Sequence, residues 1–134
     1  MAIMRAIQVQ SAANVHELES RAAANRCEVF RVDLATVDSK SKLIRAIAEA
    51  MRLPAYCGTN WDGLEECLRD LPEDKGWLLI FENADQLERL DKSQLAAFLS
   101  ILSDTAKFWE EEGHSFRVIL VGGPSLVAAV EGMP

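Results

Sequence analysis

Residues 77–81 read WLLIF, an unbroken apolar run with the length of a single β-strand. A strand with one face in water alternates apolar and polar residues, whereas a run without polar residues is typical of a parallel strand buried on both faces. Parallel strands are joined through crossover connections that usually contain a helix. The run therefore favours an α/β fold in which helices precede and follow this strand.

Helix and strand patterns alternate on both sides of this run. Helical spacing of apolar residues predicts helices over residues 14–26, 39–51, 60–71, 84–90 and 91–112. Side chains suited to capping stand at the start of four of them: Asn14, Ser39 or Ser41, Asn60 and Asp91. Further strands are expected over residues 4–10, 29–34 and 116–121, and the tail from residue 122 is left unassigned. This order predicts an α/β domain with a small, largely parallel sheet.

The chain of 134 residues has a formal net charge of −7, and this charge is unevenly distributed. Residues 1–55 hold eight basic and six acidic side chains, whereas residues 56–134 hold six basic and 15 acidic ones. An acidic surface repels nucleic acid, so we expect no direct binding of DNA or RNA. The same surface attracts a basic protein and speeds the encounter with it. The alternative interpretation is that the acidic surface only keeps the protein soluble.

Other patterns exclude several classes of protein. No apolar run approaches the roughly 20 residues that span a membrane, and no segment near the N-terminus reads as a signal peptide. The three cysteines, Cys27, Cys57 and Cys67, form no CxxC pair, and their odd number fits free thiols in a reducing cytoplasm. His16 and His114 stand alone without metal-ligand spacing, and no phosphate loop follows a strand. We therefore expect a cytoplasmic protein without a metal, a cofactor or a membrane partner.

Residues 53–71 read LPAYCGTNWDGLEECLRDL and contain a loop followed by a short helix. Leu53-Pro54 stops the preceding helix, because the residue before a proline is pushed out of the helical region. Gly58 is free to take a positive φ in the loop, and Asn60 is placed to cap the helix that follows. The pattern therefore predicts that the loop leads directly into a capped helix.

That helix carries three carboxylates on one surface, the acidic ridge. Asp62, Glu66 and Asp70 follow one another at intervals of four residues and fall opposite the apolar side of the helix. Like charges at this spacing cost about 0.2–0.5 kcal/mol per pair, so the ridge opposes local stability and points to a binding role. The alternative is a solvated helix face that is partly compensated by Arg69.

The same segment resembles the signature of the barstar family, whose members are intracellular inhibitors of secreted bacterial ribonucleases. The family pattern reads Leu-Pro-x-Tyr-aromatic-Gly-x-Asn-apolar-Asp-x-Leu with a second acidic residue and often Cys-Leu, and this chain follows it from Leu53 to Leu68. A looser similarity extends from about Glu28 to Val121. The resemblance divides a single domain into three parts: an N-terminal extension (1–27), a barstar-like core (28–121) and a C-terminal tail (122–134).

The resemblance also implies a fold and a function. The family has a three-stranded parallel sheet packed with about four helices, and the N-terminal extension either adds a strand to the sheet edge or covers it. We therefore expect an α/β fold with three or four strands and four to five helices. The implied protein is a stoichiometric inhibitor, a monomer or part of a 1:1 complex, whose acidic helix and preceding loop block the cationic active site of a basic ribonuclease.

Positions carried over from the family give five partner-binding residues: Tyr56, Gly58, Asn60, Asp62 and Glu66. The two carboxylates would pair with Arg, Lys or His⁺ in place of phosphate oxygens. Tyr56 would supply apolar area with a polar tip, although it equally fits a side chain that only packs the loop. Gly58 would shape the loop, and Asn60 would hold the helix start. Asp70 joins the set as the third member of the acidic ridge.

Four positions depart from the family pattern. Glu66 stands where Asp is usual, Cys57 replaces an aromatic residue, and Glu65 stands where an aromatic residue can occur. On the last long helix, Phe108 takes the place of a partner-contacting Glu, unless a shift by one turn brings Glu111 or Glu112 there. These differences indicate a ribonuclease other than the partner of the family prototype.

Two other functions stay open as alternatives. A barstar-like scaffold can serve as an immunity protein against a toxin that is not a ribonuclease. Asp62 and Glu66 can also be read as the acid–base or metal-binding pair of an enzyme. No His, Lys or phosphate loop accompanies them to complete a catalytic site, so we expect no enzyme activity.

Overall fold

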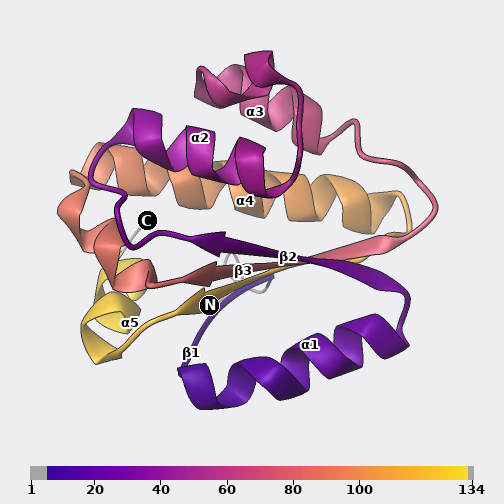
Figure 1. Cartoon of the computed structure of the whole chain (residues 1–134), viewed down its shortest axis with the longest axis horizontal. Helices are drawn as coiled ribbons and strands as arrows, with labels where there is room; N and C mark the ends of the chain where they lie inside the picture. The colour runs from indigo at the N-terminus through magenta and orange to yellow at the C-terminus, as the bar shows by residue number, and fades with distance from the viewer. Residues whose placement is uncertain (1–5, 133–134) are drawn as a thin grey trace.

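The computed structural model describes residues 6–132, which form a layered α/β arrangement around one sheet (Figure 1). The strands are β1 (Ile7–Gln10), β2 (Cys27–Asp33), β3 (Gly76–Glu82) and β4 (Phe116–Val121). The α-helices are α1 (Val15–Ala24), α2 (Lys40–Ala50), α3 (Trp61–Leu68), α4 (Lys92–Glu111) and α5 (Pro124–Glu131). The 3-10 helices are η2 (Ala12–Asn14), η3 (Ala55–Gly58) and η4 (Ala84–Arg89).

The strands lie in the order β1-β4-β3-β2, and every neighbouring pair is parallel. The predicted α/β class is confirmed. Of the three or four strands that were expected, the sheet has four. The WLLIF segment lies in β3, between β2 and β4, and its residue Leu79 pairs with Phe30 on one side and Val118 on the other. All five residues of the segment are buried, as an unbroken apolar run requires.

Helices cover both faces of the sheet (Figure 1). The helices α2, α3 and α4 lie on one side, and α1 lies on the other. Trp77, Leu79 and Phe81 of β3 belong to the larger apolar cluster on the side of α4. Leu78 and Ile80, which point to the opposite face, pack in a smaller cluster with residues of α1. Of the two alternatives for the N-terminal segment, the added strand is confirmed, because β1 extends the sheet edge beside β4. The same segment also supplies α1, which covers the second face of the sheet.

A charged cluster also ties α1 to the sheet. Arg31 of β2 forms ion pairs with Glu19 of α1 and with Glu82 of β3. These two carboxylates, Glu19 first, raise the pKa of the Arg31 guanidinium above its usual range. All three side chains are partly exposed, so the pairs contribute orientation more than stability.

Two predicted helix caps are confirmed. Ser39, the first of the two candidate serines, accepts a hydrogen bond from the Lys42 amide at the start of α2. The Asp91 carboxylate accepts from the Gln94 amide at 2.9 Å and from the Ser93 hydroxyl at 2.8 Å. These bonds, the amide first, lower the pKa of Asp91 because they favour the charged form.

Several element boundaries differ from the prediction. Residues 4 and 5 of the first expected strand lie outside the described residues, and β1 begins at Ile7. Asn14 precedes α1 but does not cap it through its side chain, because its amide Nδ2 donates instead to Gln10 Oε1 at 3.0 Å. The segment expected as a helix over 84–90 is the 3-10 helix η4, and the unassigned tail contains α5.

One polar side chain is buried in the core without a partner. Thr105 of α4 is fully buried, and its hydroxyl makes no hydrogen bond within residues 6–132. A buried hydroxyl that lacks a partner has lost its bonds to water without replacing them.

We expect Thr105→Val to raise the free energy of unfolding by about 1 kcal/mol, because valine keeps the branched shape and removes the unpaired hydroxyl. Urea unfolding followed by circular dichroism measures the change. Thr36→Val, at an exposed position, is the matched control and should change stability by less than about 0.5 kcal/mol. A less stable Thr105→Val variant would contradict the prediction.

Candidate functional site

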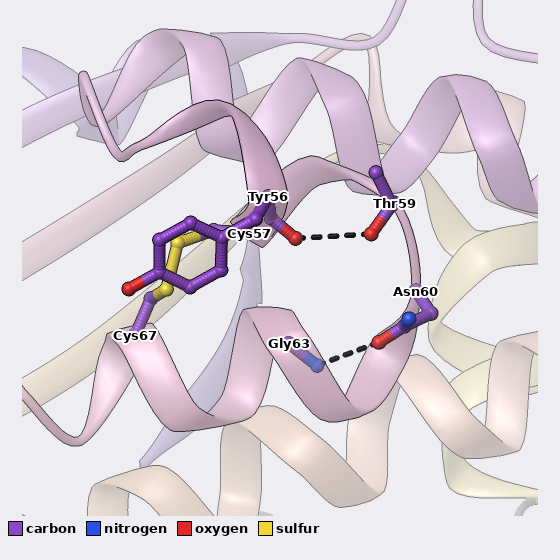
Figure 2. Close-up of a disulfide and its surroundings, with 6 residues drawn as sticks. All are labelled: Tyr56, Cys57, Thr59, Asn60, Gly63 and Cys67. Atoms are coloured by element: carbon purple, nitrogen blue, oxygen red, sulfur yellow. Dashed lines mark hydrogen bonds between the residues drawn. A yellow bond between two sulfur atoms is a disulfide. The ribbon is translucent and has the colours of Figure 1, made fainter.

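The predicted site lies on η3 and α3, which pack directly on each other (Figure 2). Within the turn, the Cys57 amide donates to the Pro54 carbonyl at 2.9 Å. The Thr59 hydroxyl donates to the Tyr56 carbonyl at 3.0 Å. A β-carbon added to Gly63 of α3 would come within 3.0 Å of the same carbonyl oxygen. The turn is therefore seated on the first turn of α3, where glycine leaves room for it.

Asn60 caps α3 as the sequence predicted. Its backbone is extended, with φ −156° and ψ 169°, and its Oδ1 accepts a hydrogen bond from the Gly63 amide at 2.7 Å. This bond satisfies one of the amides that the first turn of a helix leaves without a partner. The start and direction of α3 are thus set by the residue that joins it to the loop.

Gly58 shapes the loop through close approach rather than through an unusual backbone angle. A β-carbon at Gly58 would lie 3.3 Å from the Ala48 β-carbon and 3.7 Å from the Arg45 α-carbon of α2. Among the described glycines, a positive φ occurs at Gly113, so Gly58 does not use its freedom to take one. The missing side chain lets η3 lie against α2.

Two tryptophans hold α3 on α4 at opposite ends. At the start of α3, Trp61 Nε1 donates to Gln94 Oε1 at 3.4 Å, and its ring centroid lies 6.4 Å from that of Phe98. At the end of α3, Trp109 Nε1 donates to the Leu68 carbonyl at 2.9 Å in a buried hydrogen bond. The helix therefore cannot rock on its neighbour without breaking one of these contacts.

The third member of the acidic ridge is not on the helix. α3 ends at Leu68 instead of reaching residue 71, and Asp70 lies in the turn that follows, with its amide donating to the Cys67 carbonyl. Two constraints explain the early end. Trp109 occupies the Leu68 carbonyl, and residue 71 precedes a proline, which disfavours the helical region. Asp70 is exposed, but the ridge on the helix reduces to two carboxylates.

These two carboxylates, Asp62 and Glu66, form the acidic pair. Both are exposed, lie one turn apart on α3 and have no hydrogen bond or ion pair within residues 6–132. Arg69, which was expected to compensate the charges of the ridge, forms an ion pair with Glu65 at 3.3 Å instead. Its guanidinium lies 5.3 Å from the Phe108 ring centroid. The acidic pair therefore presents uncompensated negative charge to solvent.

Tyr56 and the acidic pair border the same junction between η3 and α3. Tyr56 is 62% exposed, so it does not serve as the loop-packing residue of the alternative interpretation. Gly63 and Cys67 face η3, and Asp62 and Glu66 precede them by one position each, which places the pair about 100° around the helix axis from that side. Tyr56, Asn60, Asp62 and Glu66 together are called the candidate surface below.

The prediction of three free thiols is wrong. Cys57 of η3 and Cys67 of α3 form a disulfide with their α-carbons 6.2 Å apart, and Cys27 stays free (Figure 2). Cys57 is fully buried and Cys67 is 7% exposed. The prediction used the odd number of cysteines and the missing CxxC motif. Neither feature shows whether two cysteines ten residues apart are brought together by the fold. In the chain-entropy description, a cross-link over a loop of this length stabilises the fold by about 2–3 kcal/mol.

The structure also describes the residues at the end of α4 that were considered for a partner contact, and it bears on the possibility of a metal site. On α4, Phe108 is half-buried beneath Arg69, whereas Glu111 and Glu112 are exposed. A partner contact from either glutamate stays a prediction. Among residues 6–132, no three His, Cys, Asp or Glu side chains come together as a metal ion would need. Within the same range, no helix has the length and apolarity to cross a membrane.

Comparison with known sequence families identifies the family to which the chain belongs. Residues 27–121 match the family described as Barstar (barnase inhibitor), and this span contains β2, β3, β4 and the candidate surface. The chain belongs to the barstar family. The family is one of ribonuclease inhibitors rather than enzymes, so membership favours an inhibitor or immunity role.

Other comparisons concern the fold alone. No curated protein sequence matches the chain. Among solved structures, a similar one is that of the Aeropyrum pernix ORC2 protein in complexes with ADPNP and ADP. The two share 14% identity over 93% of this chain, with a TM-score of 0.58, and this chain spans 36% of the length of the other. At this identity the likeness shows a shared arrangement of strands and helices.

We expect Asn60→Ala to lower the free energy of unfolding by about 1 kcal/mol, because it leaves the Gly63 amide without its acceptor. Asn60→Asp keeps an acceptor at the same place and should stay close to the native protein in stability. Urea unfolding of the three proteins makes the comparison. Equal stability of the alanine and native proteins would show that the cap contributes nothing.

Proposed function

We propose that this barstar-family protein is a stoichiometric inhibitor of a bacterial ribonuclease, and that the candidate surface enters the active site of that enzyme. The acidic pair carries the proposal. Asp62 and Glu66 are exposed, lie one turn apart and lack a partner within residues 6–132. A site that binds RNA phosphate and stabilises its reaction presents cationic groups. Carboxylates bind such groups through charge-assisted hydrogen bonds, in place of phosphate oxygens.

The way α3 is held supports this proposal. Hydrogen bonds from Trp61 and Trp109 attach both ends of α3 to its surroundings, and the disulfide attaches it to η3. Carboxylates that are in position before binding lose less conformational entropy in the complex. Tyr56 supplies exposed aromatic area on η3, which packs on α3, and tyrosine is among the residue types enriched in binding hot spots.

We further propose the kind of partner and the place of action. The partner is a basic ribonuclease of the secreted or toxin type, bound 1:1 by a monomeric inhibitor in the cytoplasm of the cell. The concentration of acidic side chains in residues 56–134 supports a basic protein partner and argues against direct contact with RNA. Glu66, which is longer by one methylene than the Asp usual in the family, supports a partner pocket that differs from that of the prototype.

The direct test is a titration of the purified protein against a panel of barnase-type ribonucleases, including any encoded beside it, with RNA cleavage as the readout. We expect inhibition that saturates at one inhibitor per enzyme. Asp62→Asn and Glu66→Gln keep side-chain size and remove one charge, and each should weaken binding by at least about tenfold. Glu17→Gln removes one charge from an exposed position of α1, across the sheet from α3, and should leave the affinity unchanged.

The outcomes of this titration separate the alternatives. Native protein that inhibits none of these ribonucleases would contradict the proposal. Tight binding to a neighbouring toxin that does not cut RNA would instead identify an immunity protein of another specificity. Equal losses for Glu17→Gln and the two α3 variants would show that only net charge matters.

We also expect the association rate to fall as salt rises, because ions screen exposed charges over about 8 Å at physiological ionic strength. Stopped-flow measurement between about 0.05 and 0.5 M salt gives the slope. The slope should become shallower in the Asp62→Asn/Glu66→Gln double variant than in Glu17→Gln. A rate that is independent of salt would show that the acidic pair does not steer the encounter.

A further inference from the structure

The disulfide links the two elements that carry the candidate surface, η3 and α3. It joins Cys57, the residue after Tyr56, to Cys67, the residue after Glu66 (Figure 2). The turn and the helix that carry the proposed contacts are therefore linked covalently beside those contacts. The other close approach between them is at Gly63, where an added β-carbon would lie 3.0 Å from the Tyr56 carbonyl oxygen.

Apart from the cross-link, the turn is held by its packing on α2 and α3 and by hydrogen bonds within it. The Tyr56 side chain is 62% exposed, so burial does not anchor it. The turn itself contains the short Cys57–Pro54 amide hydrogen bond and the Thr59 hydroxyl bond to the Tyr56 carbonyl. Without the cross-link, the position of Tyr56 relative to α3 would depend on these local bonds and on the non-covalent packing of η3 against α2 and α3.

The two sulfur atoms can also exist as thiols in the same fold. Both cysteines are buried, and a buried thiol behaves as a small apolar group that needs no strong hydrogen-bond partner. The dithiol form would keep the core of α3, through Leu64 and Leu68, and lose only the tie to η3. In a reducing cytoplasm, the few protein disulfides that form are usually transient and redox-sensing.

We propose that the Cys57–Cys67 pair is a redox-controlled clamp on the candidate surface. This inference rests on the proposed function and location, and it deepens them. The disulfide form holds η3 on α3 and binds the ribonuclease tightly, whereas the dithiol form lets η3 move and binds it more weakly. The clamp closes by thiol–disulfide exchange with a small-molecule disulfide: the two cysteine thiols are oxidised to the Cys57–Cys67 disulfide, and the small disulfide is reduced to two thiols.

Accessibility determines where the exchange takes place. Cys67 is 7% exposed and Cys57 is not exposed, so the mixed disulfide forms on Cys67 and the Cys57 thiolate then displaces the small thiol. The same order in reverse opens the clamp with a dithiol reductant. Cys27, on β2 in another part of the fold, takes no part in the exchange.

The first experiment needs no partner. In Cys27→Ser protein, which leaves the pair as the only cysteines, amide hydrogen exchange is compared between the disulfide form and the dithiothreitol-reduced form. We expect amides of residues 55–60 to exchange at least about tenfold faster after reduction, with those of α1 unchanged as the internal control. Equal exchange of residues 55–60 in both forms would overturn the clamp. Equilibration in a glutathione buffer of cytosolic ratio should yield mainly the dithiol, and a pair that stays oxidised there would be a structural cross-link.

The second experiment measures inhibition by the two forms. The target is a barnase-type ribonuclease whose own activity is checked to be unchanged by dithiothreitol. We expect the reduced form to bind roughly tenfold more weakly, as ordering of a few side chains on binding would cause. The double variant Cys57→Ala/Cys67→Ala should bind the ribonuclease with the affinity of the reduced form, and dithiothreitol should not change that affinity. Equal inhibition by the oxidised and reduced forms would overturn the clamp. If neither form inhibits any ribonuclease, the proposed function fails, and hydrogen exchange alone decides whether the pair controls the turn.

Discussion

The burial of β3 on both faces is the constraint from which the rest of the arrangement follows. Its residues alternate between two apolar clusters, so the sheet needs helices on both sides. On the larger side, Trp77 of β3 contacts Trp109 of α4, with ring centroids 4.7 Å apart, and Phe98 of α4 meets Phe81 edge-on. Trp109 then uses its indole N–H to hold the Leu68 carbonyl. The position of α3, and of the charges on it, therefore depends on the packing of α4 against the central strand β3.

The acidic pair is costly for the helix that carries it. Two like charges one turn apart repel each other, and Arg69, which follows the helix, is engaged with Glu65 and Phe108 instead. A stable surface helix has no need of this arrangement, whereas a surface that must meet cationic groups does. The repulsion is tolerated because apolar contacts of Leu64 and Leu68, and two tryptophan hydrogen bonds, hold α3 independently of its outer face.

The cysteine pair adds a covalent link to the packing of η3 on α3. At position 57 the barstar pattern carries an aromatic side chain, whereas this chain has a cysteine. Here Cys57 is fully buried and is bonded to Cys67 of α3. A bond of this kind depends on the redox conditions, whereas apolar contact does not.

The sequence by itself determined the α/β class, the order of the elements, the caps at Ser39, Asn60 and Asp91, and the residues of the candidate surface. These depend on local pattern: apolar periodicity, side chains that accept from nearby amides, and a motif read along the chain. Tertiary structure decided the place of the N-terminal strand at the sheet edge, the end of α3 at Leu68 and the disulfide. Each of these depends on a partner distant in sequence or brought close by a turn: β4 for β1, Trp109 for Leu68, and Cys67 for Cys57. Such contacts form only when the chain has folded, so no local sequence pattern predicts them.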